Sequence, residues 1–466
     1  MQYTRLLGRY ASELKFEELP DEVIEKVKLI TLHTIGVAIA SVPTETTKLA
    51  FALTKTKSGS EDATVWGSNG LKAPVEEAAF ANGTASDVMD WEDCTWTGHA
   101  SAGAIPAAFA MGEKEHVSGR QYIEAVVAAY EVYQRIAMSV QPDNEIGKKM
   151  GYGGTADWPL VNWQIFASSV AAGKILGFDP EQMATCISKS AYLTPLANGN
   201  IGCSDTYHFG HGFSARTGVS SALLTRYGAR SEYYQDALDG PNGYWQQIVD
   251  YVDWSWYDKE LGETYYIMET LLKHWPVNIW VQGPLDALDN LKRSHHFELE
   301  DIEKIEVTPS NNIYNLELKR PFRFMQAQYN LPHCFASYLK NSSPSADWFS
   351  VESCQEGSEI HEISKRITVG GDEMHYFDCF QIFMEGTFPE VTVKVTLKDG
   401  RTLSETLRHP KGHPRNMFTL DEEMEFFKAR AIPYIGEEKA EKFAAAIADL
   451  ENCNDIATLA SMLTAK

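Results

Sequence analysis

Residues Phe166–Pro180, FASSVAAGKILGFDP, indicate the architecture of most of this 466-residue chain. Before Gly177 the stretch is mostly Ala, Ser, Gly and Val, and side chains this small allow helices to pack with their backbones close together. Gly177-Phe-Asp-Pro180 then ends one helix and begins the next, because glycine is favoured just past a helix and proline in its first turn. The stretch therefore predicts two consecutive helices inside a closely packed bundle.

Helical periodicity extends over much of the remaining chain. Apolar residues recur at helical spacing in segments that we expect to form helices: 22–40, 75–85, 119–138, 180–193 and 214–227. The same pattern returns after Pro410, in 420–429, 437–450 and 455–463. Both ends of the chain are therefore expected to contribute helices to one large bundle.

The pattern changes near Lys273. Residues 390–397 and 401–407 alternate apolar and polar side chains on either side of Asp399-Gly400, which is a strong β-hairpin signal. Other short elements are expected nearby, as strands at 302–307 and 367–368 and as helices at 284–293 and 326–339. We therefore expect a mainly α fold. Its large all-helical bundle domain comprises residues 1–267 and 409–466, and a smaller α+β domain, residues 268–408, is inserted into it.

The charge balance limits the partners that the chain can have. It carries 64 acidic against 41 basic residues, a formal net charge of −23, which argues against nucleic acid or a membrane surface as partner. No segment approaches about eighteen uninterrupted apolar residues, and we expect no signal peptide. The seven cysteines include no CxxC pair, so a disulfide framework is not expected and the cytoplasm is the default location.

Common cofactor signatures are missing. The chain has no GxGxxG after a predicted strand, no phosphate-binding loop, no GxSxG elbow and no HExxH. No cofactor and no metal are therefore expected. The chemistry that remains is acids, imidazoles, a lysine and arginines, an inventory that suits proton transfer beside a carboxylate of a small-molecule substrate.

The stretch richest in such groups is Asp90–His99, DWEDCTWTGH. Asp90 and His99 are nine positions apart, so one unbroken helix would point them in opposite directions. If both act at one site, the backbone between them must leave helical geometry, and we expect it to do so at Thr97-Gly98. An acid and an imidazole on a short irregular segment suit proton transfer. The alternative is an aspartate that caps a helix and a histidine at a loop end.

A second cluster consists of Tyr207, His208 and His211, which we expect just before a helix that starts near Ser214. Two histidines three positions apart can bind metal, but no carboxylate or thiol stands at regular spacing beside them. A phosphate or carboxylate cradle is favoured instead, because the free N–H groups at a helix N-terminus point at such a ligand.

Three further segments carry positive charge. Lys273 is flanked by apolar residues, and partial burial would move its pKa toward use as an acid or base, whereas a solvated lysine is the alternative. Arg320 and Arg323, followed by His333, form a basic patch suited to gripping carboxylates, with a solvated loop as the alternative. For Lys411–Asn416, at the second crossing between the domains, a hinge or interface role is favoured.

Taken together, these clusters resemble the MmgE/PrpD family over nearly the whole chain. Asp90–His99 is similar to the family's Asp-Phe-Asp-Asp…His-Pro motif, and Lys273–Pro276 to its Lys-x-aromatic-Pro. The other similar segments are the Ala-rich helix 166–177, the helix start 212–218, residues 326–332 beside Ala-Gln-Phe-Ser-Leu-Pro, and residues 411–416 beside Gly-x-Pro-x-Asn. Each motif is loose alone, but several in register are specific.

This resemblance implies a helical domain made from both chain ends, an inserted α+β domain and an active site between them. The family includes 2-methylcitrate dehydratase, cis-aconitate decarboxylase and iminodisuccinate epimerase. Its members are typically homodimers that need no cofactor, so a homodimer is expected here as well.

The resemblance carries functional residues over unevenly. Asp90, His99 and Lys273 fall on positions implicated in catalysis in the decarboxylase branch. Several positions that would surround the substrate differ from the family. Cys94 stands where the family has Thr, Tyr207 where it has Lys, Gly210 where it has His, His333 where it has Tyr, and Gln282 where it often has His. Ala156-Asp157-Trp158 stands in place of a Gly-aromatic-His motif. These differences argue against cis-aconitate or 2-methylcitrate itself as the substrate.

The expected function is a cofactor-independent lyase, a dehydratase or decarboxylase, that removes a proton next to a carboxylate or carbonyl of a small polycarboxylate. His99, oriented by Asp90, would act as base or acid. Lys273 would stabilise the enolate-like charge, and Tyr207 completes the expected catalytic set. The residues expected to hold the substrate are Cys94, His208, His211, Arg320, Arg323 and His333. A two-base epimerase, a non-catalytic binding protein and an enzyme for an uncharged or aromatic substrate are the alternatives.

Overall fold

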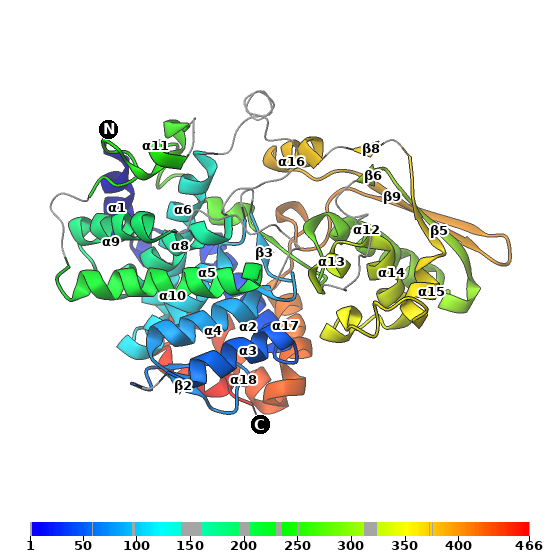
Figure 1. Cartoon of the computed structure of the whole chain (residues 1–466), viewed down its shortest axis with the longest axis horizontal. Helices are drawn as coiled ribbons and strands as arrows, with labels where there is room; N and C mark the ends of the chain where they lie inside the picture. Colours follow the sequence, from blue (N-terminus) through cyan, green and yellow to red (C-terminus); the bar gives the residue numbers. More distant parts are fainter. Residues whose placement is uncertain are drawn as a thin grey trace.

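Helices predominate in the computed structural model, which confirms the predicted mainly α fold (Figure 1). It describes residues 2–57, 59–95, 98–140, 160–194, 206–229, 235–248, 252–311, 324–371, 373–374 and 376–465. Within this part of the chain, no helix is long and apolar enough to cross a membrane.

A bundle of helices from both ends of the chain forms the larger part of the molecule (Figure 1). Its N-terminal helices are α1 (Tyr3–Glu13), α2 (Asp21–Ala40), α3 (Glu45–Lys55), α4 (Val75–Asp87), α5 (Ser101–Glu115), α6 (Gly119–Met138), α8 (Leu160–Ile175), α9 (Pro180–Leu193) and α10 (Thr206–Arg226). The C-terminal helices α17 (Leu420–Ile435) and α18 (Glu437–Ala448) pack against α2. The two chain ends therefore share one core, as the sequence pattern predicts.

Small residues set the close spacing of these helices. A side chain at Gly218 of α10 would collide with Ser168 of α8, and one at Gly212 would collide with Phe80 of α4. Because α10 packs extensively against both α8 and α4, its glycines allow two helix backbones to approach it at once. The backbone-to-backbone packing expected from residues 166–180 is therefore present.

The inserted part is built on a four-stranded sheet of order β10-β9-β5-β7. Its strands are β5 (Ile302–Thr308), β7 (Ile367–Val369), β9 (Val391–Leu397) and β10 (Thr402–Leu407). β9 is antiparallel to β10 and β5, whereas β5 and β7 run parallel. Helix α12 (Ile279–His295) packs on β9 and β10, and every second residue of β9 is buried. The hairpin expected around Asp399-Gly400 is confirmed.

Three predicted helices differ from those observed. The segment 455–463 forms a four-residue helix, Ala457–Ala460, followed by a 3₁₀ turn. The segment 326–339 forms two helices, α13 (Phe324–Gln328) and α14 (Leu331–Lys340), because Asn330 leaves helical geometry and its side chain caps the start of α14. The helix expected from Ser214 begins at Thr206. Tyr207, His208 and His211 therefore lie within the first turns of α10, and the prediction that they precede a helix is wrong.

The remaining elements are short. They are β1 (Ala63–Thr64), β2 (Lys72–Ala73), β3 (Asp93–Cys94), β4 (Leu271–Leu272), β6 (Ser310–Asn311), β8 (Glu373–Met374), α11 (Tyr244–Ile248), α15 (Glu359–Ser364), α16 (Tyr376–Met384) and α19 (Ala457–Ala460). Short 3₁₀ turns occur at 16–18, 254–257, 266–269, 299–301, 346–349, 414–416, 450–452 and 461–463.

Separate hydrophobic cores lie in the bundle and in the inserted part. The first gathers side chains from Leu7 to Leu272 and from Phe418 to Leu463, and the second gathers mainly side chains between Leu271 and Leu397. The domain division at 268 and 408 stays a prediction, because the cores do not fix exact boundaries.

The two chain crossings between these cores lie side by side. β4, at the first crossing, pairs with β3 of the bundle, and the Leu272 N–H donates to the carbonyl of Gly412 at the second crossing, 2.9 Å away. Gly412 has φ +86°, and a side chain there would collide with the Leu272 carbonyl. Only glycine fits this approach of the two crossings, which places Lys411–Asn416 at an interface.

Candidate active site at the domain junction

The β3–β4 pairing places Lys273 against the acidic stretch that follows α4. The Lys273 ammonium donates to one carboxylate oxygen of Asp90 and, over 2.5 Å, to one of Glu92. The side chains of Lys273 and Glu92 are each 1% exposed and that of Asp90 is 10% exposed. Partial burial was expected for this lysine, and its burial is nearly complete.

Asp90 is held in an unusual backbone conformation. Its φ is +48°, in the left-handed region, and its N–H donates to the Asp87 carbonyl over 2.8 Å. The chain therefore leaves helical geometry directly after α4, earlier than the expected Thr97-Gly98, of which Thr97 lies outside the described residues. Among the described residues, the second carboxylate oxygen of Asp90 has no hydrogen-bond partner although it is buried.

The acid that orients His99 is Glu92. His99 Nδ1 lies 2.9 Å from Glu92 Oε1 and 2.7 Å from the carbonyl oxygen of Asp93. The prediction that Asp90 orients His99 is therefore wrong. Asp93 has a structural role, because its carboxylate accepts hydrogen bonds from Ser101 at the start of α5 and from the Tyr130 hydroxyl.

The charges of this cluster follow from its burial and its partners. Burial opposes the ammonium of Lys273, but Asp90 and Glu92 hold its pKa well above the usual range. Burial raises the pKa of Asp90 to about 6, against the pull of Lys273. The pKa of His99 is raised to about 9 because the Glu92 carboxylate outweighs burial. Near neutral pH, His99 can therefore donate a proton, and Asp90 can accept one.

A second cluster of polar side chains lies between α4 and α10. His208 Nδ1 lies 2.7 Å from Asp87 Oδ2, and His211 Nε2 lies 3.0 Å from the same oxygen. His211 Nδ1 is 2.9 Å from Gln164 Oε1 of α8. Since the imidazoles bind side chains of neighbouring helices, the expected cradle of free helix N–H groups is not formed by these residues. No group of side chains suited to a metal ion occurs in the described part of the chain.

Tyr207 and Cys94 lie at the edges of these clusters. The Tyr207 ring is 5.1 Å from the His211 ring and 5.5 Å from the His208 ring, measured between centroids. Burial and the charge of Asp87 raise the pKa of Tyr207 well above its usual range. Burial likewise raises the pKa of Cys94, whose sulfur lies 3.4 Å from the Thr95 carbonyl. Both residues therefore stay protonated near neutral pH and do not act as anionic bases.

The predicted carboxylate-gripping patch is not assembled as expected. His333 is buried in the inserted part, where its Nε2 lies 2.7 Å from the Trp348 carbonyl. Burial lowers the pKa of His333 to about 4, so it is neutral and its polar atom is already bonded. The expectation that His333 grips a carboxylate is therefore wrong. Arg320 and Arg323 lie outside the described residues.

Several residues of the two clusters were missed by the sequence reasoning. Glu92 belongs to the Asp90–His99 stretch, but the sequence does not show which of its acids faces His99. Tyr329 stands where the family motif Ala-Gln-Phe-Ser-Leu-Pro has Phe, and this extra hydroxyl was an available signal. Burial and the Asp90 charge raise the pKa of Tyr329, which places its phenol beside the first cluster. For Asp87 and Gln164 no sequence signal was available.

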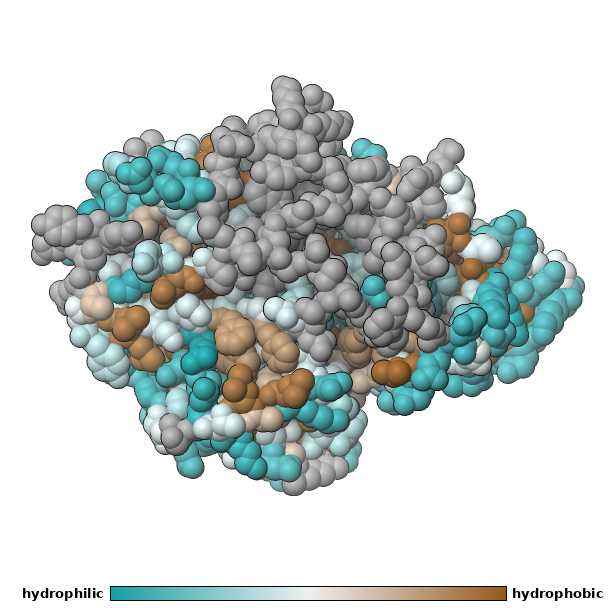
Figure 2. Space-filling view, viewed as in Figure 1, coloured by the Kyte–Doolittle hydropathy of each residue, from teal (hydrophilic) through white to brown (hydrophobic). Residues whose placement is uncertain are grey.

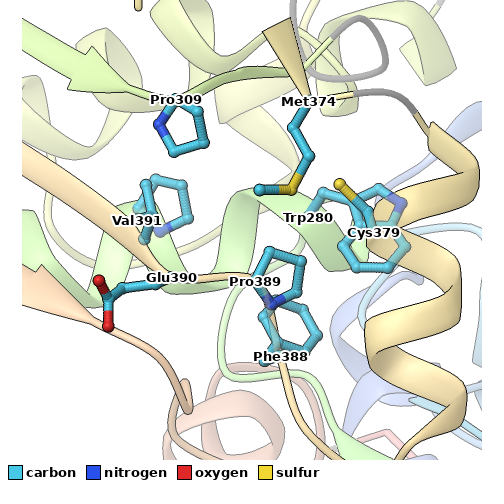
Figure 3. Close-up of a pocket in the computed structure, with 9 residues that line it drawn as sticks. Trp280, Pro309, Met374, Cys379, Phe388, Pro389, Glu390 and Val391 are labelled. Atoms are coloured by element: carbon cyan, nitrogen blue, oxygen red, sulfur yellow. The ribbon is translucent and has the colours of Figure 1, made fainter. Parts of the chain in front are cut away.

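A separate hollow occurs in the inserted part and is apolar (Figure 3). Trp280 of α12, Met374, Cys379 of α16 and Phe388 surround it, with Pro309 at its rim. Among the described residues that line it, Glu390 is the one acidic side chain. These lining residues include no imidazole or lysine like those at the domain junction.

Comparisons with known proteins cover almost the whole chain. The MmgE/PrpD N-terminal domain matches residues 5–257, and the MmgE/PrpD C-terminal domain matches residues 275–452. The human cis-aconitate decarboxylase is 23% identical over 97% of this chain and 92% of its own length. A cis-aconitate decarboxylase-like protein of Aspergillus oryzae is 22% identical over 99% and 97%, and the Aspergillus terreus cis-aconitate decarboxylase is 22% identical over 88% and 85%.

Proposed function

Because the chain belongs to the MmgE/PrpD family, we propose that it is a lyase that removes a proton beside a carboxylate of a small polycarboxylate. The observation that carries this proposal is the buried cluster of Asp90, Glu92, Lys273 and His99. It combines a base, an acid and a fixed positive charge at one place, and each is a side chain of the protein, so we propose that no cofactor takes part.

Asp90 is the proposed base. Its carboxylate is ionised above about pH 6 and retains one oxygen without a partner among the described residues. The proton leaves the carbon next to the substrate carboxylate and passes to that oxygen. The negative charge that develops on the substrate is stabilised by Lys273, and such preorganised electrostatic stabilisation is usually the largest single contribution to catalysis.

His99 is the proposed acid. Histidine more often serves as the base, but here the carboxylate Asp90 takes that role. In a dehydration, the carbon–oxygen bond breaks and the leaving hydroxide takes the His99 proton to become water. A decarboxylation needs no proton removal by Asp90: the carbon–carbon bond breaks, CO₂ leaves, the electron pair of that bond stays on the substrate, and the resulting carbanion takes the His99 proton. Glu92 stabilises the imidazolium of His99 before the reaction.

Proton NMR in D₂O with a panel of small di- and tricarboxylates tests the proposal. We expect one of them to lose water or CO₂, seen as a new alkene signal or as loss of the carboxylated carbon. His99→Ala and Lys273→Ala should each abolish most of this turnover. Absence of α-proton exchange, alkene formation and CO₂ release throughout the panel would refute the proposal.

An epimerase is the second candidate, and the pair Asp87–His208 favours it. Two imidazole–carboxylate pairs at one site, Glu92–His99 and Asp87–His208, provide the two proton-handling groups that inversion at a carbon needs. The same NMR experiment separates the outcomes. An epimerase incorporates deuterium at the α-carbon and yields the opposite configuration, without an alkene or CO₂.

The substrate of the named relatives does not transfer directly. The identity to the human cis-aconitate decarboxylase is 23%. The resemblance of the motifs also implies that Cys94, Tyr207 and His333 stand where the family has other residue types. We propose that the substrate is a different small polycarboxylate. Including cis-aconitate in the panel tests this, because its turnover at a rate above every other compound would contradict it.

A homodimer is part of the proposal. Apolar side chains are exposed on neighbouring helices, at Leu49 and Leu53 of α3 and at Phe213 and Leu224 of α10, and this face is visible in Figure 2. Light scattering coupled to gel filtration should give twice the mass of one chain, and Leu224→Glu should lower it. The predicted cytoplasmic location also stays a proposal, which cell fractionation tests.

A further inference from the structure

We infer that Asp87 and His208 form a second anion-binding pole, in which the His208 imidazolium presents Nε2–H to a carboxylate other than the one held at Lys273. His211 and Gln164 are positioning residues for this pair. The inference rests on the proposed function only for the identity of the bound group, a substrate carboxylate. It narrows the substrate class to compounds with a carboxylate on either side of the reacting carbon.

The geometry of the pair leaves one polar atom available. His208 Nδ1 donates to Asp87 Oδ2 over 2.7 Å, and both residues are only 2% exposed. His208 Nε2, on the other side of the ring, is buried and has no hydrogen-bond partner among the described residues. A buried donor without a partner costs about 1–3 kcal/mol, and an anionic oxygen removes that cost when it binds.

The charges around His208 favour its protonated form. Burial opposes protonation, but the adjacent Asp87 carboxylate raises the pKa of His208, and Asp90 and Glu92 act in the same direction. His208 and His211 in turn hold the pKa of Asp87 well below its usual range, although burial opposes this. The neighbouring Tyr207 remains neutral. A buried imidazolium with a free N–H is suited to bind a carboxylate.

Gln164 fixes this arrangement through His211. The Gln164 side-chain amide donates to the His99 carbonyl over 2.5 Å, and a carbonyl can only accept, so the amide orientation is determined. Its oxygen must then face His211 Nδ1, 2.9 Å away, which has to carry the proton. The other ring nitrogen of His211, Nε2, lies 3.0 Å from Asp87 Oδ2 but has no hydrogen-bond partner among the described residues, and burial lowers the pKa of His211. Gln164 thereby holds the neutral His211 ring against the carboxylate that binds His208.

This link connects the two poles of the site. The rings of His99 and His211 have centroids 6.1 Å apart. The negative charge of Asp87 also favours a higher pKa for both His99 and Glu92. A ligand with one carboxylate fills only one pole, and we expect it to be the one at the Lys273 ammonium. A ligand with two satisfies both, and the site therefore discriminates by the number of carboxylates.

Calorimetric titration with succinate and glutarate, each beside its monomethyl ester, tests the inference without requiring turnover. Wild-type protein should bind the better dicarboxylate at least tenfold more tightly than its ester. Asp87→Asn and His208→Gln should reduce this ratio about tenfold and leave ester binding unchanged. Lys273→Met should weaken both ligands, and His116→Gln, which removes an exposed histidine, serves as the matched control with no effect.

A pH titration of the wild-type protein provides a second measurement. The dicarboxylate-to-ester ratio should fall as the pH rises through the pKa of His208, and this fall should be absent in His208→Gln, which has no titrating group there. In Gln164→Leu the pH of this fall should shift, since His211 is no longer fixed while His208 still titrates. A ratio near one in the wild type, or a ratio that Asp87→Asn and His208→Gln both leave unchanged, would overturn the inference.

The two proposals fail separately. If the ratio behaves as expected but no compound in the NMR panel reacts, the second pole stands and the lyase proposal falls. If a polycarboxylate reacts in the wild type while the ratio is insensitive to Asp87 and His208, the lyase proposal stands and the second pole falls.

Discussion

Two buried ion clusters of this protein differ in how completely their carboxylate oxygens are hydrogen-bonded. In α6, Arg135 pairs with Glu131 at 2.5 Å, both side chains are 0% exposed, and the second Glu131 oxygen accepts from the Ile267 N–H. At the domain junction, Asp90 and Glu92 share Lys273, yet each carboxylate keeps one buried oxygen without a partner among the described residues.

This difference distinguishes an ion pair that stabilises the fold from an ion cluster that can bind or react with a ligand. A satisfied carboxylate has no capacity left for a ligand, so the Glu131–Arg135 pair serves to join α6 to the segment around Ile267. A buried carboxylate oxygen without a hydrogen bond lowers the stability of the fold, so its presence calls for an explanation such as a role in binding or catalysis. The left-handed conformation of Asp90 is a second cost at the same place, and such costs cluster at functional sites.

The largest expected effect concerns the structural pair. Arg135→Met leaves Glu131 buried without its counter-charge and should lower the free energy of unfolding by about 3–5 kcal/mol. Chemical denaturation measures this. The double variant Arg135→Met/Glu131→Gln is the control and should recover most of the loss. A loss below about 1 kcal/mol would contradict the view that this pair is structural.

The junction cluster should respond in the opposite way. Lys273→Met should lower kcat/KM for the compound found by NMR by about 10²–10³, because stabilisation of the developing charge is lost. Its stability at pH 6 should fall less than that of Arg135→Met, since Asp90, with a pKa of about 6, can take up a proton when the lysine is gone. Equal losses of stability in Lys273→Met and Arg135→Met would contradict the view that only the Glu131–Arg135 pair is structural.

Asp90→Asn should make the protein more stable at neutral pH. The folded-state pKa of Asp90 is about 6 against an ordinary value of 3.8, so the folded state binds more protons than the unfolded state between these values. The free energy of unfolding therefore falls as the pH rises from about 4 to 6, by about 2 kcal/mol. Asn cannot ionise, so denaturation curves of the variant should lack this fall.

The smallest expected effect is in the pH profile of activity. The rising limb of kcat/KM should lie near pH 6, where Asp90 ionises, and the falling limb near pH 9, where His99 loses its proton. Each limb changes the rate about tenfold per pH unit. His99→Gln should remove the falling limb and keep the rising one. A falling limb that persists in this variant would show that another group supplies the proton.

Much of the fold could be predicted because it depends on local pattern. Helical periodicity placed most helices within a few residues, and the alternation around Asp399-Gly400 placed the hairpin. Where prediction failed, tertiary contacts were the cause. The helix start at Thr206 depends on contacts of its first turns with Asp87 and Gln164, which are distant in sequence and belong to other helices.

The candidate site also has a part that could be predicted from the sequence and a part that could not. Residue types and the resemblance located Asp90, His99 and Lys273 together, and the structure places all three in one cluster. The partner of His99 could not be predicted, because Glu92 and Asp90 are both near it in sequence and only the strand pairing of β3 with β4 decides which faces the imidazole. His333 failed because its burial was not visible from its neighbours.

The Phe166–Pro180 stretch determined by itself that helices pack closely, since side-chain size and turn residues act within a few positions of the chain. The small residues of α8 and α10 fit one another as that stretch indicates. Only the tertiary structure decided which acid binds which base. Asp87 and His208 are 121 positions apart, and their pairing depends on the relative placement of two helices and on the exclusion of water between them, neither of which is a local property.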